Sequence, residues 1–245
     1  MTTAIGKVVA VVEALSEERR ITAISRSTGL PVSTVHRILQ ELVQVGWVRE
    51  DDDRGYLFGP RLLGLAGRAG DHTTLTRIAG PYLAELCEIT GHAVHFAVRS
   101  GDEVVYIDKL EGSRAYRMRS RIGLAIPLHC TAIGKALLAR LPTDEVRAIA
   151  ARAGLPARTT HTITSPDQLV AHLAGIRQRG YSIDDEENEL QIRCVGAAVS
   201  DHARPIGGIS LSMLAFELTE ESLQQVAPLV VRAAGSITAA LGGQT

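Results

Sequence analysis

The segment PLHCTAIGK, residues 127–135, carries groups that can bind an anion. A loop leads there into a predicted helix over 132–140, and Thr131 is placed to cap its first turn. The first backbone N–H groups of a helix have no partner inside the helix, and the helix dipole adds positive potential at this end. The segment therefore predicts either a small anion site at Thr131, Ala132 and Ile133 or ordinary capping by Thr131.

A second group of polar residues lies on or beside strands that are predicted later in the chain. Its members are Asp184, Cys194, Ser210 and Ser212. Ser210 and Ser212 point to the same face, because side chains alternate along a strand. Polar groups that face inward need hydrogen-bond partners, and a small polar ligand, water or neighbouring side chains would supply them.

A thiol nucleophile is another interpretation of this region. His129 lies beside Cys130, but adjacent side chains of an extended loop point apart, and no third group is evident that would orient the histidine. We favour a structural or pocket-lining role for both. The alternative function is a small thiol-dependent hydrolase or isomerase that uses His129, Cys130 and Asp184.

The acidic run at 184–189 holds five carboxylates, which raises the question of a metal site. It lacks the ligand spacing of an EF-hand, so a solvated loop is the better interpretation. G-x-G-x-x-G, P-loop, H-E-x-x-H and G-x-S-x-G motifs do not occur in the sequence. We therefore expect neither a metal nor a cofactor.

Residues 21–48, ITAISRSTGLPVSTVHRILQELVQVGWV, have the pattern of two helices joined by a turn at Gly29, which can adopt a positive φ. In the second helix, over about 32–45, one face is apolar: Val35, Ile38, Leu39 and Leu42. The opposite face is polar: Ser33, Arg37, Gln40 and Gln44. The pattern predicts a buried face and a polar face that is free to bind.

A hairpin follows this helix pair. Gly46 ends the second helix, residues 47–50 and 56–58 are predicted strands, and DDDRG makes the turn. Two helices followed by a hairpin form a winged helix-turn-helix, whose second helix enters the major groove of DNA. There Arg37 can pair with guanine, while Ser33 and Thr34 can bond bases or phosphates. The candidate DNA contacts are Thr22, Ser33, Thr34, His36, Arg37, Gln40, Arg49 and Arg54.

The charge balance limits this interpretation. The net charge is −1, and residues 1–60 hold seven basic and eight acidic side chains, whereas DNA-binding modules usually show a basic footprint. Four acids lie in the wing turn at 50–53. We expect the wing tip to point away from DNA or to present only Arg49 and Arg54. A winged helix that binds protein instead of DNA is the alternative.

The remaining pattern predicts an α+β fold. We expect helices over 5–16, from Pro60, over 75–90, and from Thr143, Ser165 and Thr219, with Gln168 completing a capping box at Ser165. Strands are expected over 92–99, 104–110, 114–120, 181–185, 193–200 and 206–213. The run GRAGDHTT from Gly67 should interrupt the helical pattern. We assign residues 1–60 to a winged helix-turn-helix DNA-binding domain, 61–80 to a linker helix and 81–245 to an effector-binding domain.

The helix from Pro60 has an apolar surface, formed by Leu62, Leu63, Leu65 and Ala66, that it cannot bury alone. Packing against a second chain would cover this surface, so we expect a dimer, possibly a tetramer, that matches a two-fold operator. Three cysteines provide no disulfide framework, and the sequence lacks a signal peptide and a run long enough to span a membrane. We expect a soluble cytoplasmic protein without a membrane partner.

Several spaced motifs, in the same order, resemble the isocitrate-lyase-regulator (IclR) family of bacterial transcription factors. They are TGLPVSTVHRILQELVQVGWV, YLFGPRLLGLA, IPLHCTAIGKALLA and GYSIDDEENELQIRCVGAAV, and they cover nearly the whole chain. The resemblance implies a regulator of double-stranded operator DNA whose second domain has a fold similar to the GAF sensor domain.

The resemblance also implies a site for a small organic acid, carboxylic or aromatic. Family members that sense small carboxylates hold them with N–H groups at the positions of Ala132 and Ile133. Side chains at the positions of Asp184, Cys194, Ser210 and Ser212 complete the polar contacts, and Met118, Ile126 and Ile192 would form the apolar wall. Asp184 suits a carboxylate site only if it binds a ligand hydroxyl or is protonated by burial. A ligand that prefers one arrangement of the paired domains would change operator affinity through the linker helix.

Overall fold

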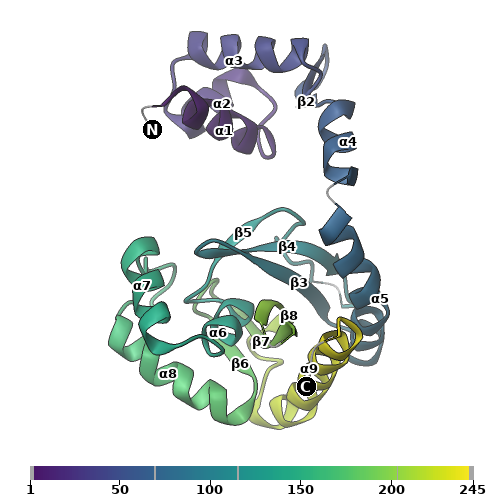
Figure 1. Cartoon of the computed structure of the whole chain (residues 1–245), viewed down its shortest axis with the longest axis vertical. Coiled ribbons are helices and arrows are strands. Elements are labelled where there is room, and N and C mark those ends of the chain that lie inside the picture. Colours follow the sequence, from purple (N-terminus) through teal and green to yellow (C-terminus); the bar gives the residue numbers. More distant parts are fainter. Residues whose placement is uncertain (1–2, 69, 115, 203, 243–245) are drawn as a thin grey trace. The chain divides into compact units, whose positions relative to one another are not determined.

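The computed structural model describes residues 3–242 with gaps at 69, 115 and 203. The chain divides into two compact units, Met1–Thr73 and Thr74–Thr245. Most of their helices and strands are labelled in Figure 1. In the described part of the chain, no helix is both long enough and apolar enough to cross a membrane.

The first unit is a three-helix core with a two-stranded wing. Its elements are α1 Ala4–Leu15, α2 Ile21–Thr28, α3 Val32–Gln44, β1 Val48–Asp51, β2 Gly55–Phe58 and α4 Pro60–Arg68. The apolar face of α3 is buried as the pattern predicts, and it packs on Val11, Leu15 and Ile24 of the first two helices. Gly29 has a φ of 68° and ends α2, and β1 pairs antiparallel with β2. The winged helix-turn-helix is therefore confirmed.

The second unit is built on a six-stranded antiparallel sheet in the order β5-β4-β3-β8-β7-β6. The strands are β3 Ala93–Ser100, β4 Glu103–Leu110, β5 Ala125–Pro127, β6 Ser182–Asp185, β7 Ile192–Asp201 and β8 Arg204–Leu214. The helices are α5 Gly70–Thr90, α6 Ala132–Leu138, α7 Thr143–Ala153, α8 Pro166–Arg179 and α9 Glu220–Ala240. The predicted α+β class is therefore confirmed for this unit.

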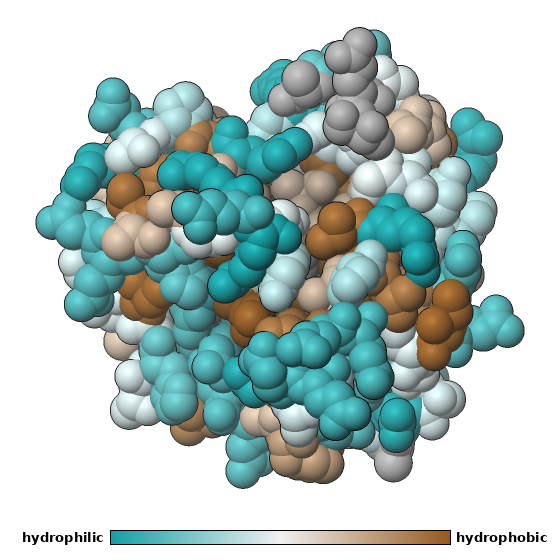
Figure 2. Space-filling view, turned by 90° about the horizontal axis from the view of Figure 1, so that it is seen from below, coloured by the Kyte–Doolittle hydropathy of each residue, from teal (hydrophilic) through white to brown (hydrophobic). Residues whose placement is uncertain are grey.

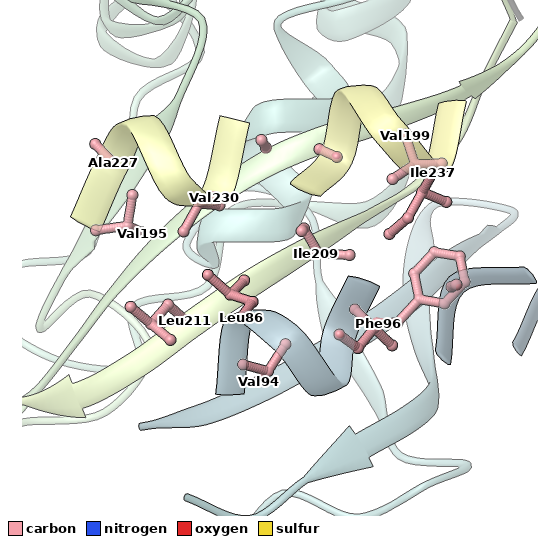
Figure 3. Close-up of a cluster of buried hydrophobic side chains, with 14 of the residues drawn as sticks. Leu86, Val94, Phe96, Val195, Val199, Ile209, Leu211, Ala227, Val230 and Ile237 are labelled. Carbon is pink, nitrogen blue, oxygen red and sulfur yellow. The ribbon is translucent and has the colours of Figure 1, made fainter. Parts of the chain in front are cut away.

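Helices cover both faces of this sheet (Figure 1). On one face, α5 and α9 pack against alternate side chains of the central strands, among them Val94, Phe96, Ile209 and Leu211 (Figure 3). The intervening residues of the same strands point to the other face, where α6 packs with α7 and α8 behind it. Polar residues such as Ser210 and Ser212 therefore face α6.

Three expectations about local structure are wrong. The described residues of the segment 114–120 do not form a strand; Tyr106 of β4 exchanges backbone hydrogen bonds with Gly123 and Leu124, so the strand beside β4 begins only at Ala125. The carbonyls of Met118 and Ser120 accept instead from the Lys109 amine, each at 2.8 Å.

The other two concern helices. α5 begins at Gly70 and not near residue 75, because polar and Gly residues lower helix propensity without forbidding a helix. The expected interruption of the helical pattern from Gly67 is therefore also wrong for the described residues, since α4 extends to Arg68 and α5 begins at Gly70; residue 69 lies outside the described residues. Ser165 precedes α8 as expected, but its side chain makes no capping hydrogen bond. α8 therefore begins at Pro166, after a residue with an extended backbone, and it lacks the expected capping box.

Candidate DNA-binding surface and ligand cavity

The polar face of α3 is accessible in the first unit. Ser33, His36 and Arg37 are exposed, as is Thr22 at the start of α2. Arg37 forms an ion pair with Glu41 one turn later at 2.8 Å, and both side chains remain more than half exposed. An exposed pair of this kind contributes little to stability, so Arg37 is free to exchange its partner for a base or a phosphate.

Two predicted contacts on α3 are less accessible. Thr34 and Gln40 are half-buried, and the Gln40 amide donates a hydrogen bond of 3.3 Å to the hydroxyl of Tyr56. Tyr56 lies on β2 with its ring in the core, so this bond ties the recognition helix to the wing. Burial raises the pKa of Tyr56, which keeps the hydroxyl protonated. The sequence analysis missed Tyr56, although its place in a short strand beside the core is a signal for burial.

The wing turn is held by hydrogen bonds that orient its charges. The Asp51 carboxylate accepts from the Arg54 N–H at 2.9 Å and lies 3.5 Å from the Arg49 guanidinium. Arg20, which the sequence analysis did not select, donates to the Asp53 carbonyl at 3.1 Å. Asp51 is thus partly neutralised, and Arg49 and Arg54 remain exposed.

In the second unit, a cavity of about 360 Å³ lies between the sheet, the start of α6 and the loop between β6 and β7. All the residues that the sequence and the resemblance assign to an effector site line this one cavity: Met118, Ile126, Thr131, Ala132, Ile133, Asp184, Ile192, Cys194, Ser210 and Ser212. They come from six separate stretches of the chain, which the sheet and α6 bring together.

The start of α6 lies unusually close to the sheet, and glycine makes this approach possible. A Cβ at Gly196 would lie 2.8 Å from the backbone of Ala132, and a Cβ at Gly208 would lie 3.1 Å from the Ile133 side chain. Ser182 donates to the Ala132 carbonyl at 2.5 Å and fixes this end of the helix on the strands. Small residues on β7 and β8 therefore place the first turn of α6 beside the strand serines.

Thr131 caps α6 as predicted. Its hydroxyl accepts from the Gly134 N–H at 3.2 Å and donates to the Pro127 carbonyl at 2.7 Å. The N–H groups of Ala132 and Ile133 precede the first possible bond inside the helix. Capping by Thr131 and two N–H groups without a partner inside the helix therefore coexist at this position.

A chain of polar contacts crosses the sheet beneath the cavity. Cys194 Sγ lies 3.1 Å from Ser212 Oγ, which lies 3.3 Å from His95 Nδ1, and His95 Nε2 lies 2.6 Å from Ser120 Oγ. Burial, with a smaller effect of the Lys109 charge, lowers the pKa of His95 to about 3. The imidazole is therefore neutral, with one ring nitrogen as a hydrogen-bond donor and the other as an acceptor for these contacts. The sequence analysis missed His95. The alternation of apolar residues along β3 shows that Val94 and Phe96 are buried, but it does not show that the opposite face, which carries His95, is buried as well.

The carboxyl of Asp184 is buried against the same cavity. Burial raises its pKa to about 7, although the nearby Lys135 charge and hydrogen bonds from the Glu187 and Asn188 N–H groups oppose the shift. Near neutral pH, Asp184 therefore exists in both protonation states. This is the condition under which an aspartate is compatible with a bound carboxylate.

His129 and Cys130 do not form a nucleophile and its base. The His129 ring bonds to the Pro156 carbonyl at 3.1 Å, and burial raises the pKa of the Cys130 thiol to about 12. A thiol with so high a pKa is almost entirely protonated at neutral pH and is a poor nucleophile. No cluster of three possible metal ligands occurs among the residues that the structure describes.

Further residues line the cavity that the sequence analysis did not select. They are Tyr106, Arg119, Ser120, Leu124, Ala125, Arg158, Asn188 and Glu189. Tyr106 and Ala125 lie on strands β4 and β5, and the others lie on segments that are irregular in the structure. Arg119 and Ser120 belong to the segment where a strand was wrongly expected.

Two other hollows in this unit differ from the cavity in shape or chemistry. A pocket of about 100 Å³ beside His129 is lined mainly by apolar side chains. A larger groove of about 840 Å³ lies between α6, α8, β7 and α9, and its lining is mostly small residues such as Ala136, Ala198 and Gly235. Figure 2 shows the side of the molecule that includes α8 and α9, where apolar residues lie in a hollow bordered by hydrophilic ones. Neither hollow gathers polar groups as the cavity does.

Comparisons with known proteins identify the family. The model for the IclR helix-turn-helix domain matches residues 4–52, and the model for the C-terminal part of bacterial IclR transcriptional regulators matches residues 68–239. The HTH-type transcriptional regulator KdgR of Escherichia coli is 36% identical over 240 residues, covering 96% of this chain and 91% of KdgR.

Solved structures agree with this assignment. The Thermotoga maritima IclR structure is 31% identical with a TM-score of 0.77, and the match covers 97% of this chain and 98% of that one. An IclR homologue from Microbacterium hydrocarbonoxydans, solved with 4-hydroxybenzoate, shares the fold with a TM-score of 0.83 at 23% identity, over 98% of this chain and 99% of that one. The chain belongs to the IclR family of bacterial transcriptional regulators, and it is a DNA-binding regulator and not an enzyme.

Proposed function

We propose that this regulator contacts its operator through α3 and the wing, and that a small organic acid bound in the cavity changes its operator affinity. In this proposal, residues 1–60 bind double-stranded DNA, 61–80 form a linker helix and 81–245 bind the effector. The observation that carries it is the gathering of all ten predicted effector residues around one cavity. As a DNA regulator, the protein would act in the cytoplasm.

The DNA contacts in this proposal are the accessible residues of the first unit. Arg37 would read a guanine edge, Ser33 and His36 would contact bases or phosphates, and Arg49 and Arg54 would contact the backbone beside the wing. Thr22 would contact phosphate at the start of α2. Thr34 and Gln40 have a smaller part, because both are half-buried and the Gln40 amide already bonds to Tyr56.

The effector in this proposal is an acid of modest size. The N–H groups of Ala132 and Ile133 would receive its carboxylate, while Ile126, Ile192 and Met118 would pack on its carbon skeleton. Ser210, Ser212, Cys194 and Asp184 would bond its polar substituents. The homologue solved with 4-hydroxybenzoate is a precedent within the fold for an aromatic acid as ligand.

Control of the operator requires a second copy in this proposal. Leu62 and Leu65 of α4 are incompletely buried, with Leu65 40% exposed, and contact with a partner would cover them; the side chains of Leu63 and Ala66 lie outside the described residues. Self-association would pair two α3 helices for a two-fold operator. An acid would then act by binding one arrangement of the pair more tightly than the other.

Selection of duplexes from a random library, followed by affinity measurements across a salt series, tests the proposal. A DNA regulator should enrich a two-fold sequence and lose affinity steeply as salt rises, because phosphate contacts release counterions. Adding small carboxylic and aromatic acids should then shift the measured affinity. Failure to enrich any duplex would favour a winged helix that binds protein, and enrichment without any response to acids would remove the effector half of the proposal.

A further inference from the structure

The loop between β6 and β7 holds a carboxylate against the cavity that no described residue neutralises. Glu189 is half-buried and lines the cavity, and its side chain has no hydrogen bond or ion pair with any residue in the described part of the chain. Its negative charge affects the pKa values of other groups that line the cavity. The pKa of Tyr106 and that of Cys194 are raised mainly by burial, and the negative charge of Glu189 adds to both shifts.

This loop is held firmly at both ends, so the position of Glu189 is determined by the fold. The Glu187 carboxylate forms a buried ion pair with Lys135 of α6. The hydroxyls of Thr159 and Thr162 donate to the Glu186 and Glu187 carbonyls at 2.7 and 2.6 Å. These contacts fix the backbone before Glu189, and the Glu186 N–H donates to the Ile192 carbonyl at 3.2 Å, which joins the two ends of the loop in which Glu189 lines the cavity.

The loop backbone is also strained at its two ends. Glu186 and Gln191 both have positive φ values, of 58° and 66°. L-residues rarely adopt this conformation, and it persists where the surrounding contacts impose it. The surrounding contacts therefore impose the conformation of this loop and with it the positions of its middle residues.

The neighbouring polar groups extend the same acceptor-rich side of the cavity. The amide oxygen of Asn188 is buried and has no hydrogen-bond partner among the described residues, and Asp184 lies on the adjoining strand. Arg119 and Arg158 also line the cavity, and neither forms an ion pair with a described residue. The lining therefore offers both cations for an acid group and acceptors for a donor.

We propose that Glu189 is a specificity-determining residue that selects acids whose second polar group is a hydrogen-bond donor, an amino group first and a hydroxyl second. An unpaired carboxylate accepts a charge-assisted hydrogen bond from an ammonium or hydroxyl group and repels a second carboxylate. An acid with a methyl group in place of the second polar group would leave the Glu189 carboxylate desolvated and unpaired. This inference rests on the proposed effector role of the cavity and adds the class of effector.

Matched acids that differ only at their far end test this inference. One set is butanoate, 4-hydroxybutanoate, 4-aminobutanoate and butanedioate; the other is benzoate with its 4-hydroxy, 4-amino and 4-carboxy derivatives. Titration calorimetry on the full-length protein should show the amino or hydroxy acid of at least one set binding about tenfold or more tighter than the diacid and the unsubstituted acid of that set. Glu189→Gln should reduce the preference over the diacid to about threefold or less, because the amide keeps the shape and removes the charge.

The matched control is Glu88→Gln, which removes an exposed carboxylate of α5 far from the cavity lining. It should leave the ranking of the acids unchanged. Equal binding of the diacid and the amino acid by the wild type, an undiminished preference over the diacid in Glu189→Gln, or no binding of either set would overturn the inference. Operator binding measured without any acid separates these outcomes from a failure of the DNA-binding proposal, since Glu189→Gln should leave ligand-free operator affinity as it is.

Discussion

The polar face of α3 and the buried contacts that hold the cavity's loop in place use similar side chains in opposite surroundings. The ion pair between Arg37 and Glu41 is 68% and 60% exposed, whereas the pair between Lys135 and Glu187 is 0% and 6% exposed. In water, side chains can exchange partners at little cost, which suits contact with DNA. Away from water, the same groups depend on each other, and burial moves the pKa of Asp184 to about 7. The polar face of α3 is thus adaptable, and the cavity is preorganised.

Removing one member of each ion pair is the strongest way to break this comparison. Lys135→Met should lower the free energy of unfolding by about 3–5 kcal/mol, because it leaves the Glu187 carboxylate buried and uncompensated. Glu41→Gln should change stability by less than about 0.5 kcal/mol. Urea unfolding of both variants measures the difference.

A double variant serves as the control for this prediction. Lys135→Met combined with Glu187→Leu removes both buried charges and should recover much of the lost stability. If Lys135→Met alone were as stable as the wild type, the buried pair would not hold the loop between β6 and β7. The comparison between exposed and buried pairs would then fail.

The Arg37→Ala variant tests whether the polar face of α3 reads the DNA sequence. Loss of a bidentate contact with guanine should cost about 1–3 kcal/mol of operator affinity and relax base preference at one position of each half-site. Arg54→Ala should weaken all duplexes alike, because a phosphate contact carries no sequence information. Binding assays on an operator with single-base changes distinguish the two. An Arg37→Ala variant that keeps its base preference would show that Arg37 does not read sequence.

The pKa of Asp184 predicts how acid binding depends on pH. Its pKa is raised, so the carboxyl is protonated below about pH 7 and charged above it. A charged Asp184 repels a bound carboxylate, so affinity for an acid should be level below pH 7 and fall above it, by at most about tenfold per pH unit. Calorimetry between about pH 6 and pH 8 measures this, with ligands that stay ionised throughout.

Asp184→Asn provides the control for this pH dependence. The amide cannot ionise, so the variant should bind acids with similar affinity across the same pH range. A wild-type affinity that does not change with pH would mean that Asp184 does not face the bound acid group.

The sequence was sufficient wherever a residue's direction follows from periodicity. Val35, Ile38, Leu39 and Leu42 repeat with the period of a helix, so the buried face of α3 could be predicted. Strand alternation likewise put Ser210 and Ser212 on one face. The motif resemblance supplied the grouping of residues from distant segments, which periodicity does not provide.

The sequence was insufficient where long-range contacts decide the structure. The sequence of the segment 114–120 alternates like that of a strand, yet the Lys109 amine donates hydrogen bonds to the Met118 and Ser120 carbonyls. Glu189 looked like one acid of a solvated run, and its position at the cavity depends on Thr159, Thr162 and Lys135, which lie far away in the sequence. Likewise, nothing local to Gln40 indicates that Tyr56 holds its amide.

The contact between Gln40 and Tyr56 gives the smallest expected effect, and it lies where the two kinds of environment meet. Tyr56→Phe removes one half-buried hydrogen bond at 3.3 Å, so it should lower the free energy of unfolding by about 0.5–1.5 kcal/mol. Operator affinity should change by no more than about twofold, since Tyr56 itself is buried. Urea unfolding and duplex titration measure the two quantities. Gln40→Ala is the companion variant: if it alters base preference, the amide leaves Tyr56 when DNA binds, and Gln40 then belongs with Arg37 on the adaptable surface and not with the core that supports the wing.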